Sequence, residues 1–197
     1  MKLTGYFIYD DFEEFKTQMK ENQIHVGDQL LMQDIDGDAL YTVADIDEAA
    51  GHYAMVREHL LEDTKPIRTR GFNLFDWLNN EYKDTLPAEI IEHMAADGDQ
   101  PLISLPREIE VFGENRYANA EESGHQWEYF KKTKNRIATV TDFDEWSHWW
   151  WLATPEDDMD RASAAYFCRC HSFGYAAYCG GASDAGLYVR PRFILAK

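Results

Sequence analysis

The residues with the clearest capacity for chemistry lie in one short stretch near the end of the chain. Cys168, Cys170 and His171 form the run Cys-Arg-Cys-His, and Cys179 follows. Thiolate and imidazole groups are ligands that copper and zinc accept, so these four residues are a candidate metal site. The alternative is that the cysteines are buried, unreactive thiols, the usual state of a structural cysteine. We favour this alternative and predict no bound metal.

Other catalytic arrangements have weaker support. Three serines lie near His171 in the sequence, but none stands in the Gly-x-Ser-x-Gly setting of a hydrolase. They are Ser163, Ser172 and Ser183. The pair Gly180-Gly181 lacks the lysine and helix start of a phosphate-binding loop. His148 lies within an aromatic run, which favours a packing role over a catalytic base. We therefore expect a protein that is not an enzyme and uses no cofactor.

The same stretch suits ligand binding better. Tyrosine, serine, glycine and alanine dominate it, a composition typical of binding loops. The predicted ligand-binding residues are Tyr166, Arg169, His171, Phe173, Tyr175, Tyr178, Asp184 and Tyr188. Core packing with a bonded hydroxyl is the alternative for each tyrosine taken singly. Calcium-dependent sugar binding is less favoured, because the carboxylates between Glu156 and Asp160, with Asp184, show no spacing typical of a calcium site.

Charge and composition exclude several classes of function. The 197 residues include 36 acids and 19 bases, which gives a net charge of -17. This balance disfavours nucleic acid and anionic membranes as partners. The start of the chain lacks the pattern of a secretory signal, and no apolar run is long enough to span a bilayer. Three cysteines do not make a disulfide framework, so we expect a cytoplasmic location or one in a phage particle.

The first two thirds of the chain are predicted to be helical with one hairpin. A helix begins at Asp10 and packs through the stripe Phe12, Phe15 and Met19. Two apolar runs flank the turn signal Asp36-Gly37 and predict a β-hairpin. They are residues 29–33 and 39–44. Three further helices are expected, and their start signals are Asn73, Pro87 and the Ser104–Pro106 step, with Gly98 and Gly113 as the later stops.

The last quarter is predicted to contain strands and a long loop. Trp149–Pro155 forms a buried strand, and Ser163–Cys170 forms a second strand with alternating faces. One face carries Ala164, Tyr166, Cys168 and Cys170. Residues 172–186 form a loop, and Leu187–Leu195 is the closing strand. The whole is a single α+β domain, residues 1–197, with a helix-rich part to about residue 135 and a β part over about 136–197.

Four ordered motifs resemble a known family. They are Asn-Leu-Phe-Asp-Trp-Leu-Asn-Asn from Asn73, Leu-Ile-Ser-Leu-Pro from Leu102, Trp-Trp-Leu-Ala-Thr-Pro from Trp150, and Val-Arg-Pro from Val189. Together they resemble a bacterial and prophage domain of unknown function with a C-type-lectin-like fold. That fold is related to formylglycine-generating enzymes and to variable proteins diversified by retroelements. The chain departs from the family at Ala153, where a basic residue is usual, and before Val189, where a glycine is usual.

The resemblance implies a stable scaffold that displays variable surface residues and has no established catalytic set. We therefore expect a noncatalytic protein that binds a protein or a glycan, and that is derived from a phage or prophage. Two alternatives stay open. One is a metal- or thiol-dependent enzyme similar to formylglycine-generating enzymes. The other is a structural subunit whose aromatic face contacts further copies in an oligomer.

Overall fold

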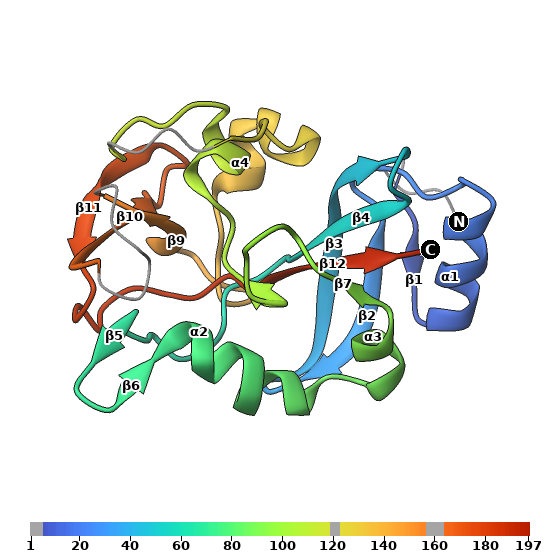
Figure 1. Cartoon of the computed structure of the whole chain (residues 1–197), viewed down its shortest axis with the longest axis horizontal. Coiled ribbons are helices and arrows are strands. Elements are labelled where there is room, and N and C mark those ends of the chain that lie inside the picture. The colour runs from blue at the N-terminus through green and yellow to red at the C-terminus, as the bar shows by residue number, and fades with distance from the viewer. Residues whose placement is uncertain (1–5, 119–122, 157–163) are drawn as a thin grey trace.

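The computed structural model describes residues 6–118, 123–156 and 164–197. The described residues form three β-sheets and several short helices, so the predicted mixture of α and β structure is confirmed. Figure 1 shows the seven-stranded sheet and helix α1 (Phe12–Lys20) at one end, and the three-stranded sheet at the other. Within the described ranges, no helix is both long and apolar enough to cross a membrane. Ser163 and Asp160, named above, lie outside these ranges, as do Asp157 and Asp158 between Glu156 and Asp160.

The residue that caps helix α1 lies one position later than predicted. The cap is Asp11 and not Asp10, because the Asp11 carboxylate accepts from the backbone N–H of Glu13 at 2.7 Å. A carboxylate in this position satisfies amide groups that the helix itself leaves without acceptors. The predicted apolar stripe is confirmed, since Phe12, Phe15 and Met19 are all buried.

The predicted hairpin forms the centre of the larger sheet. Its strands are β2 (Gln29–Asp34) and β3 (Gly37–Asp47), followed by β4 (His52–Arg57). Asp34 pairs with Gly37, so Ile35 and Asp36 make the two-residue turn. Gly37 has a φ of +101°, a conformation that favours glycine. The short strand β1 (Ile8–Tyr9) extends this sheet by pairing in parallel with β2.

The central helices are shorter than predicted. Asn73 caps α2 (Leu74–Trp77) as expected, and the chain continues as one π-helical turn over Leu78–Tyr82. Helix α3 (Ala88–Glu92) stops well before Gly98, because Met94 joins strand β7 (Met94–Ala95). Helix α4 (Glu108–Phe112) ends at Gly113, whose φ of +79° confirms the predicted stop. The first 135 residues thus hold these helices but also the strands of most of the larger sheet.

The last strand joins the larger sheet, not the smaller one. Strand β12 (Arg192–Ala196) lies antiparallel between β4 on one side and β7 with β8 (Ile103–Ser104) on the other. The predicted start at Leu187 was therefore five residues too early. Residues 187–191 are irregular apart from a single parallel bridge between Tyr188 and Trp150.

The smaller sheet contains a strand that the sequence did not indicate. Its order is β11-β10-β9, with β9 over Trp150–Pro155, β10 over Tyr166–Cys170 and β11 over Ala176–Gly181. The loop predicted over residues 172–186 is wrong, because β11 pairs along β10. The predicted alternation in β10 is also wrong. A register shift between Phe167 and Arg169 leaves Tyr166 exposed while Phe167, Cys168 and Cys170 are all buried.

Both faces of the smaller sheet are covered. Trp151 and Phe167 belong to the hydrophobic cluster that continues into the larger sheet. Trp150 and Cys168 belong to a second cluster, which is closed by residues around Phe130. With much of both faces buried, this sheet is a fixed platform, and its ends, its turns and the edge strand β11 present side chains to solvent.

Each of two β-hairpin turns contains a glycine with a positive φ, in the left-handed region. The β10–β11 turn, over residues 171–174, has Gly174 at a φ of +76°. The small sheet of β5 (Arg68–Thr69) and β6 (Phe72–Asn73) turns through Gly71 at a φ of +86°. The two glycines differ in surroundings, because a Cβ on Gly174 would meet the Thr133 carbonyl at 2.8 Å, whereas a Cβ on Gly71 would meet nothing within 4 Å.

Candidate ligand-binding face

A hollow of about 420 Å³ lies where strand β9 begins. Its lining residues are Ser147, His148, Trp149, Arg169, Ser172, Gly186, Leu187 and Tyr188. Two backbone hydrogen bonds fix the segments on either side of it. Trp151 N–H donates to the Tyr188 carbonyl, and Tyr188 N–H donates to the Trp149 carbonyl, both at 3.1 Å. The hollow therefore has a backbone frame that does not depend on its side chains.

Trp149 is the central ring of this lining. The His171 ring lies 4.2 Å from it, centroid to centroid, and the Arg169 guanidinium carbon lies 4.6 Å from the same centroid. A guanidinium over an indole ring is an attractive cation–π pair. Arg169 is fixed further, because its Nε donates to the Tyr178 carbonyl at 2.6 Å. Three planar groups are thus held together at one wall of the hollow.

A second ring pair and a loop contact complete the lining. The His148 and Tyr188 rings lie 4.5 Å apart, and His148 N–H donates to the Ala138 carbonyl at 2.9 Å. The Ser147 hydroxyl donates to the Ser172 carbonyl at 2.8 Å. That bond joins the segment before β9 to the β10–β11 turn, so the two sides of the hollow are tied to each other.

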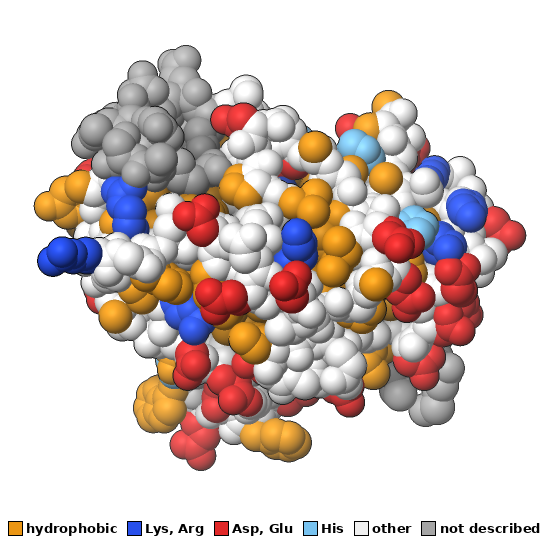
Figure 2. Space-filling model, turned by 60° about the horizontal axis from the view of Figure 1, so that its bottom comes forward, with side chains coloured by type: hydrophobic (Ala, Val, Ile, Leu, Met, Phe, Trp, Pro, Cys, Tyr) orange, Lys and Arg blue, Asp and Glu red, His pale blue; other side chains and the backbone are white. Residues whose placement is uncertain are grey.

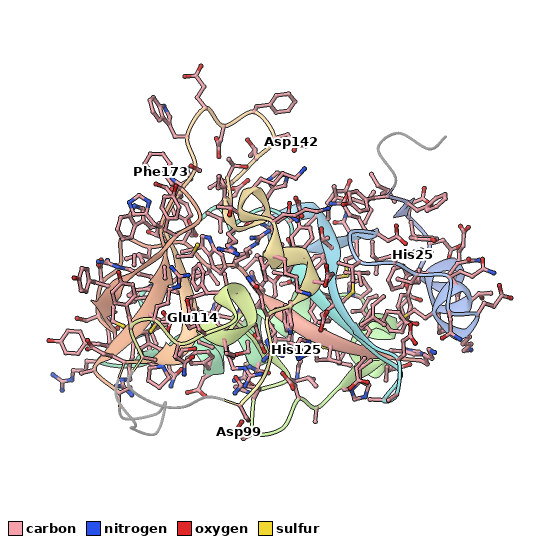
Figure 3. All side chains as sticks on the ribbon, turned by 90° about the horizontal axis from the view of Figure 1, so that it is seen from above. His25, Asp99, Glu114, His125, Asp142 and Phe173 are labelled. Carbon is pink, nitrogen blue, oxygen red and sulfur yellow. The ribbon has the colours of Figure 1, made fainter. Side chains whose placement is uncertain are left out.

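Exposed aromatic rings stand at the same edge of the molecule. Phe173 is 62% exposed and continues the stack, with its ring 5.2 Å from that of His171. Trp146 is 75% exposed and Phe143 is 93% exposed, both in the segment before Ser147, and Phe143 also lines a separate hollow beside β2 and β3. Figure 3 places Phe173 and Asp142 at one edge, far from His25. Figure 2 shows hydrophobic side chains that project at the lower edge, with acidic side chains beside them.

We name the hollow, together with His171, Phe173, Trp146 and Phe143, the aromatic face. Of the eight predicted binding residues, the structure brings four together there: Arg169, His171, Phe173 and Tyr188. Tyr178 is exposed, but its ring packs 4.8 Å from Tyr117. Tyr166 and Tyr175 are exposed on β10 and just before β11. Asp184 accepts from the Gly186 N–H at 2.9 Å and so shapes a turn.

The alternative metal site does not assemble. Cys170 Sγ faces the Arg136 carbonyl at 3.6 Å, and burial raises the pKa of this thiol to about 12. His171 belongs to the Trp149 stack instead. In the ranges that the structure describes, no group of three or more histidine, cysteine, aspartate or glutamate side chains has a geometry for a metal ion.

Cys168 and Cys179 remain as a close pair. Their Sγ atoms lie 3.2 Å apart across β10 and β11. Cys168 Sγ also lies 3.7 Å from Glu108 Oε2, and donates to it. The hydrogen bond with Cys179, together with burial, raises the pKa of the Cys168 thiol well above its usual range.

Sequence reasoning missed several residues of this region. It assigned Trp149 to a buried strand and His148 to packing, and it gave no role to Ser147, although all three line the hollow. The signal available was a histidine and a tryptophan directly before a strand, where side chains stand at a sheet end. It also missed Glu108, whose buried carboxylate accepts from the Tyr117 N–H at 3.2 Å.

The fold and this face define a mixed α and β protein whose smaller sheet ends in an aromatic-lined hollow. Residues 103–197 match a family described as Domain of unknown function (DUF6273). The matched segment begins at β8 and includes the whole lining of the hollow. No curated protein and no solved structure matches the chain.

Proposed function

We propose that the protein binds a protein or a glycan through the aromatic face, without catalysing a reaction on it. The observation that carries this proposal is a framed hollow whose Trp149 wall continues through the His171 ring to the exposed Phe173 ring. Large aromatic side chains bring much contact area with little loss of side-chain entropy, and they dominate the binding energy of many interfaces. The volume of about 420 Å³ lies within the range of small-ligand sites.

The charge of the residues that line the hollow limits the kinds of ligand that fit it. Among the described residues that line the hollow, none is acidic, although the chain as a whole carries a net charge of -17. Arg169 contributes a positive charge at its wall. A neutral or anionic group of the ligand therefore fits the hollow better than a cationic one.

The proposal also includes the fold of the smaller sheet that carries the aromatic face. We infer that β9, β10 and β11 form the fixed platform of a C-type-lectin-like arrangement, and that the segments before β9 and between β10 and β11 are its display loops. The motif resemblance supports this inference and supports a bacterial phage or prophage origin. A place in the cytoplasm or in a phage particle follows from that origin.

A binding screen with matched variants tests the proposal. The full chain is applied to a glycan array and to an array of bacterial and phage surface proteins, and any hit is titrated by calorimetry. Phe173→Ala and Trp146→Ala remove exposed rings of the aromatic face and are expected to weaken binding about tenfold or more. Ile8→Ala is the control, since Ile8 is 61% exposed on β1 of the larger sheet.

Equal affinity of all these variants for the hit would place the contact elsewhere and overturn the proposal. Loss of affinity in Ile8→Ala as well would show a general effect on the fold. The control therefore separates a contact made by this face from a change in stability.

A structural subunit is the second candidate, favoured by the 93% exposure of Phe143. A ring so exposed gains contact area when a second copy covers it. Sedimentation velocity over a hundredfold range of concentration separates the two candidates. A mass that rises with concentration, and that Phe143→Ala returns to the monomer, would favour the subunit. A constant mass would leave ligand binding as the use of this face.

A further inference from the structure

Cys168 and Cys179 face each other across neighbouring strands. The register shift between Phe167 and Arg169 places Cys168 opposite the middle of β11. The two Sγ atoms lie 3.2 Å apart, whereas the sulfurs of a disulfide are about 2.0 Å apart. A movement of about 1 Å therefore suffices for a bond. Cys170 is the third cysteine and faces the Arg136 carbonyl, so it takes no part in the pair.

The two thiols differ in access. Cys168 is fully buried, while Cys179 is partly exposed at the edge strand β11. An oxidant in solution therefore meets Cys179 first. Cys168 stays behind it, with its thiol directed to Cys179 and to Glu108. This is the arrangement of an attacking cysteine with a resolving cysteine beside it.

Glu108 supplies an acceptor for the proton of the resolving thiol. Its carboxylate is fully buried, lies 3.7 Å from Cys168 Sγ, and also accepts from the Tyr117 and Ala118 N–H groups. These two amide bonds fix the carboxylate in place. A thiol must lose its proton to act as a nucleophile, and the acceptor is already in contact with it.

We propose that Cys168 and Cys179 are a redox site that forms a reversible disulfide with a small disulfide such as oxidised glutathione as the oxidant. Cys179 loses its proton to solvent, and its sulfur attacks one glutathione sulfur, breaks the glutathione disulfide and releases one glutathione thiolate, which takes up a proton from solvent. Cys168 Sγ then attacks the Cys179 sulfur and displaces the second glutathione thiolate. The Cys168 proton passes to Glu108 and then to the displaced thiolate. Two protein thiols are oxidised, and one glutathione disulfide is reduced to two thiols.

The Cys168–Cys179 disulfide would affect the part of the aromatic face that β10 and β11 carry. Cys168 precedes Arg169 and Cys179 follows Tyr178, and the Arg169 Nε bond to the Tyr178 carbonyl lies beside the sulfur pair. The disulfide closes the segment that contains His171 and Phe173, so oxidation ties the two strands that carry this part of the face. A cross-link of this kind raises the melting temperature by roughly 5–10 °C for a chain of this size.

Thiol counting on the full-length reduced protein tests the proposal. The protein is incubated with oxidised glutathione, alkylated, and analysed by mass spectrometry and peptide mapping. We expect loss of two of the three thiols, a Cys168–Cys179 cross-link, no retained glutathione, and reversal by dithiothreitol. Cys170→Ser should behave like the wild type. Cys168→Ser should stop at a stable mixed disulfide on Cys179, and Cys179→Ser should retain its thiols.

Three retained thiols in the wild type, a stable glutathione adduct on Cys179, or a cross-link to Cys170 would each overturn the proposal. The wild-type result stands even where a variant fails to fold. Since no ligand of the aromatic face is present, the result is also independent of the proposed binding function.

Discussion

Asp34 ends strand β2 with its carboxylate buried, and the Arg57 Nε donates to it at 2.8 Å. The Tyr41 and Tyr82 hydroxyls also donate to this carboxylate, at 2.6 Å and 3.1 Å. Burial alone would raise the pKa of Asp34. The hydrogen bond and charge of Arg57, with the Tyr41 hydroxyl, outweigh burial and lower this pKa below its usual value of 3.8. Such a pair is costly to break, because the remaining charge stays buried.

Arg57 keeps Asp36 as a second carboxylate partner at 2.9 Å, so Asp34→Ala is expected to lower the free energy of unfolding by about 1.5–3 kcal/mol at pH 7. Asp38→Ala is the matched control, since Asp38 is exposed in the same hairpin and should change stability by less than about 0.5 kcal/mol. Urea denaturation followed by tryptophan fluorescence measures both. Similar losses of unfolding free energy in Asp34→Ala and Asp38→Ala would contradict a stabilising role of the buried Asp34–Arg57 pair.

The same pair predicts a dependence on pH. A carboxyl group with a lowered pKa in the folded state contributes stability that is present above its unfolded pKa. That contribution is lost as the pH falls through the folded pKa, hence below 3.8. The stability difference between wild type and Asp34→Ala should thus shrink from pH 5 toward pH 2. A difference that stays constant over this range would exclude a role for the Asp34 charge.

At the scale of single residues, sequence chemistry predicted four residues that lie at the aromatic face and missed three that line its hollow. It selected Arg169, His171, Phe173 and Tyr188 because their stretch is rich in tyrosine, serine and glycine, a composition typical of binding loops. It could not place Ser147, His148 or Trp149, since their roles depend on Tyr188 pairing with Trp150 across a long stretch of sequence. Nor could it predict that Cys179, and not Cys170, lies beside Cys168, because the register shift in β10 has no signature in sequence.

At the scale of elements, the β10–β11 turn positions Ser172 and Phe173 on the aromatic face. Gly174→Ala adds two costs there: a left-handed backbone conformation and a Cβ that lies 2.8 Å from the Thr133 carbonyl oxygen. The first cost alone is about 1–2 kcal/mol, and the second adds about 1–3 kcal/mol of overpacking. Gly71→Ala carries only the first cost, because its φ is +86° and nothing lies within 4 Å.

Thermal denaturation of both variants should show a larger drop in melting temperature for Gly174→Ala than for Gly71→Ala. Each kcal/mol corresponds to about 2–4 °C in a chain of this size. Gly181→Ala is a further control, with open space around it and an ordinary φ. Equal drops for Gly174→Ala and Gly71→Ala would show that the turn moves away from Thr133 at no cost, and that it does not fix this edge of the face.

The sequence predicted correctly those elements that depend on interactions between residues close in sequence. Asn73 caps α2 because its side chain accepts from the Phe75 N–H at 2.9 Å, an interaction within three residues. The β2–β3 hairpin, whose turn is Ile35 and Asp36, also depends on residues that are close in sequence. Strand β11 was missed because Gly180 and Gly181 are typical of loops, and only pairing with β10 makes them a strand. The start of β12 was missed because its partners lie far away in sequence.

At the scale of the whole molecule, the segment that matches the family does not contain all of its own sheet. Strand β12 lies inside residues 103–197, yet its longest pairing is with β4, from Arg192 opposite Val56 to Ala196 opposite His52. Arg190 adds to this dependence. Its Nε donates to the Arg57 carbonyl at 2.9 Å, and its guanidinium lies 5.3 Å from the Trp150 ring centroid. Phe193 and Leu195 are fully buried in a cluster that includes Tyr41.

Residues 103–197 alone are therefore expected to remain unfolded, and residues 1–102 likewise, because each lacks one side of the β4–β12 pairing. Burial of Phe193 and Leu195 contributes about 1.5–3 kcal/mol each, and the fragment would expose both side chains on β12. Near-ultraviolet circular dichroism should show fixed tryptophans in the full chain only, with one cooperative unfolding transition. Mixing the two fragments should restore part of that signal, since the contacts they share are extensive. A cooperative transition in residues 103–197 by themselves would make the matched segment an independent domain, and would overturn the prediction that residues 1–197 fold as one.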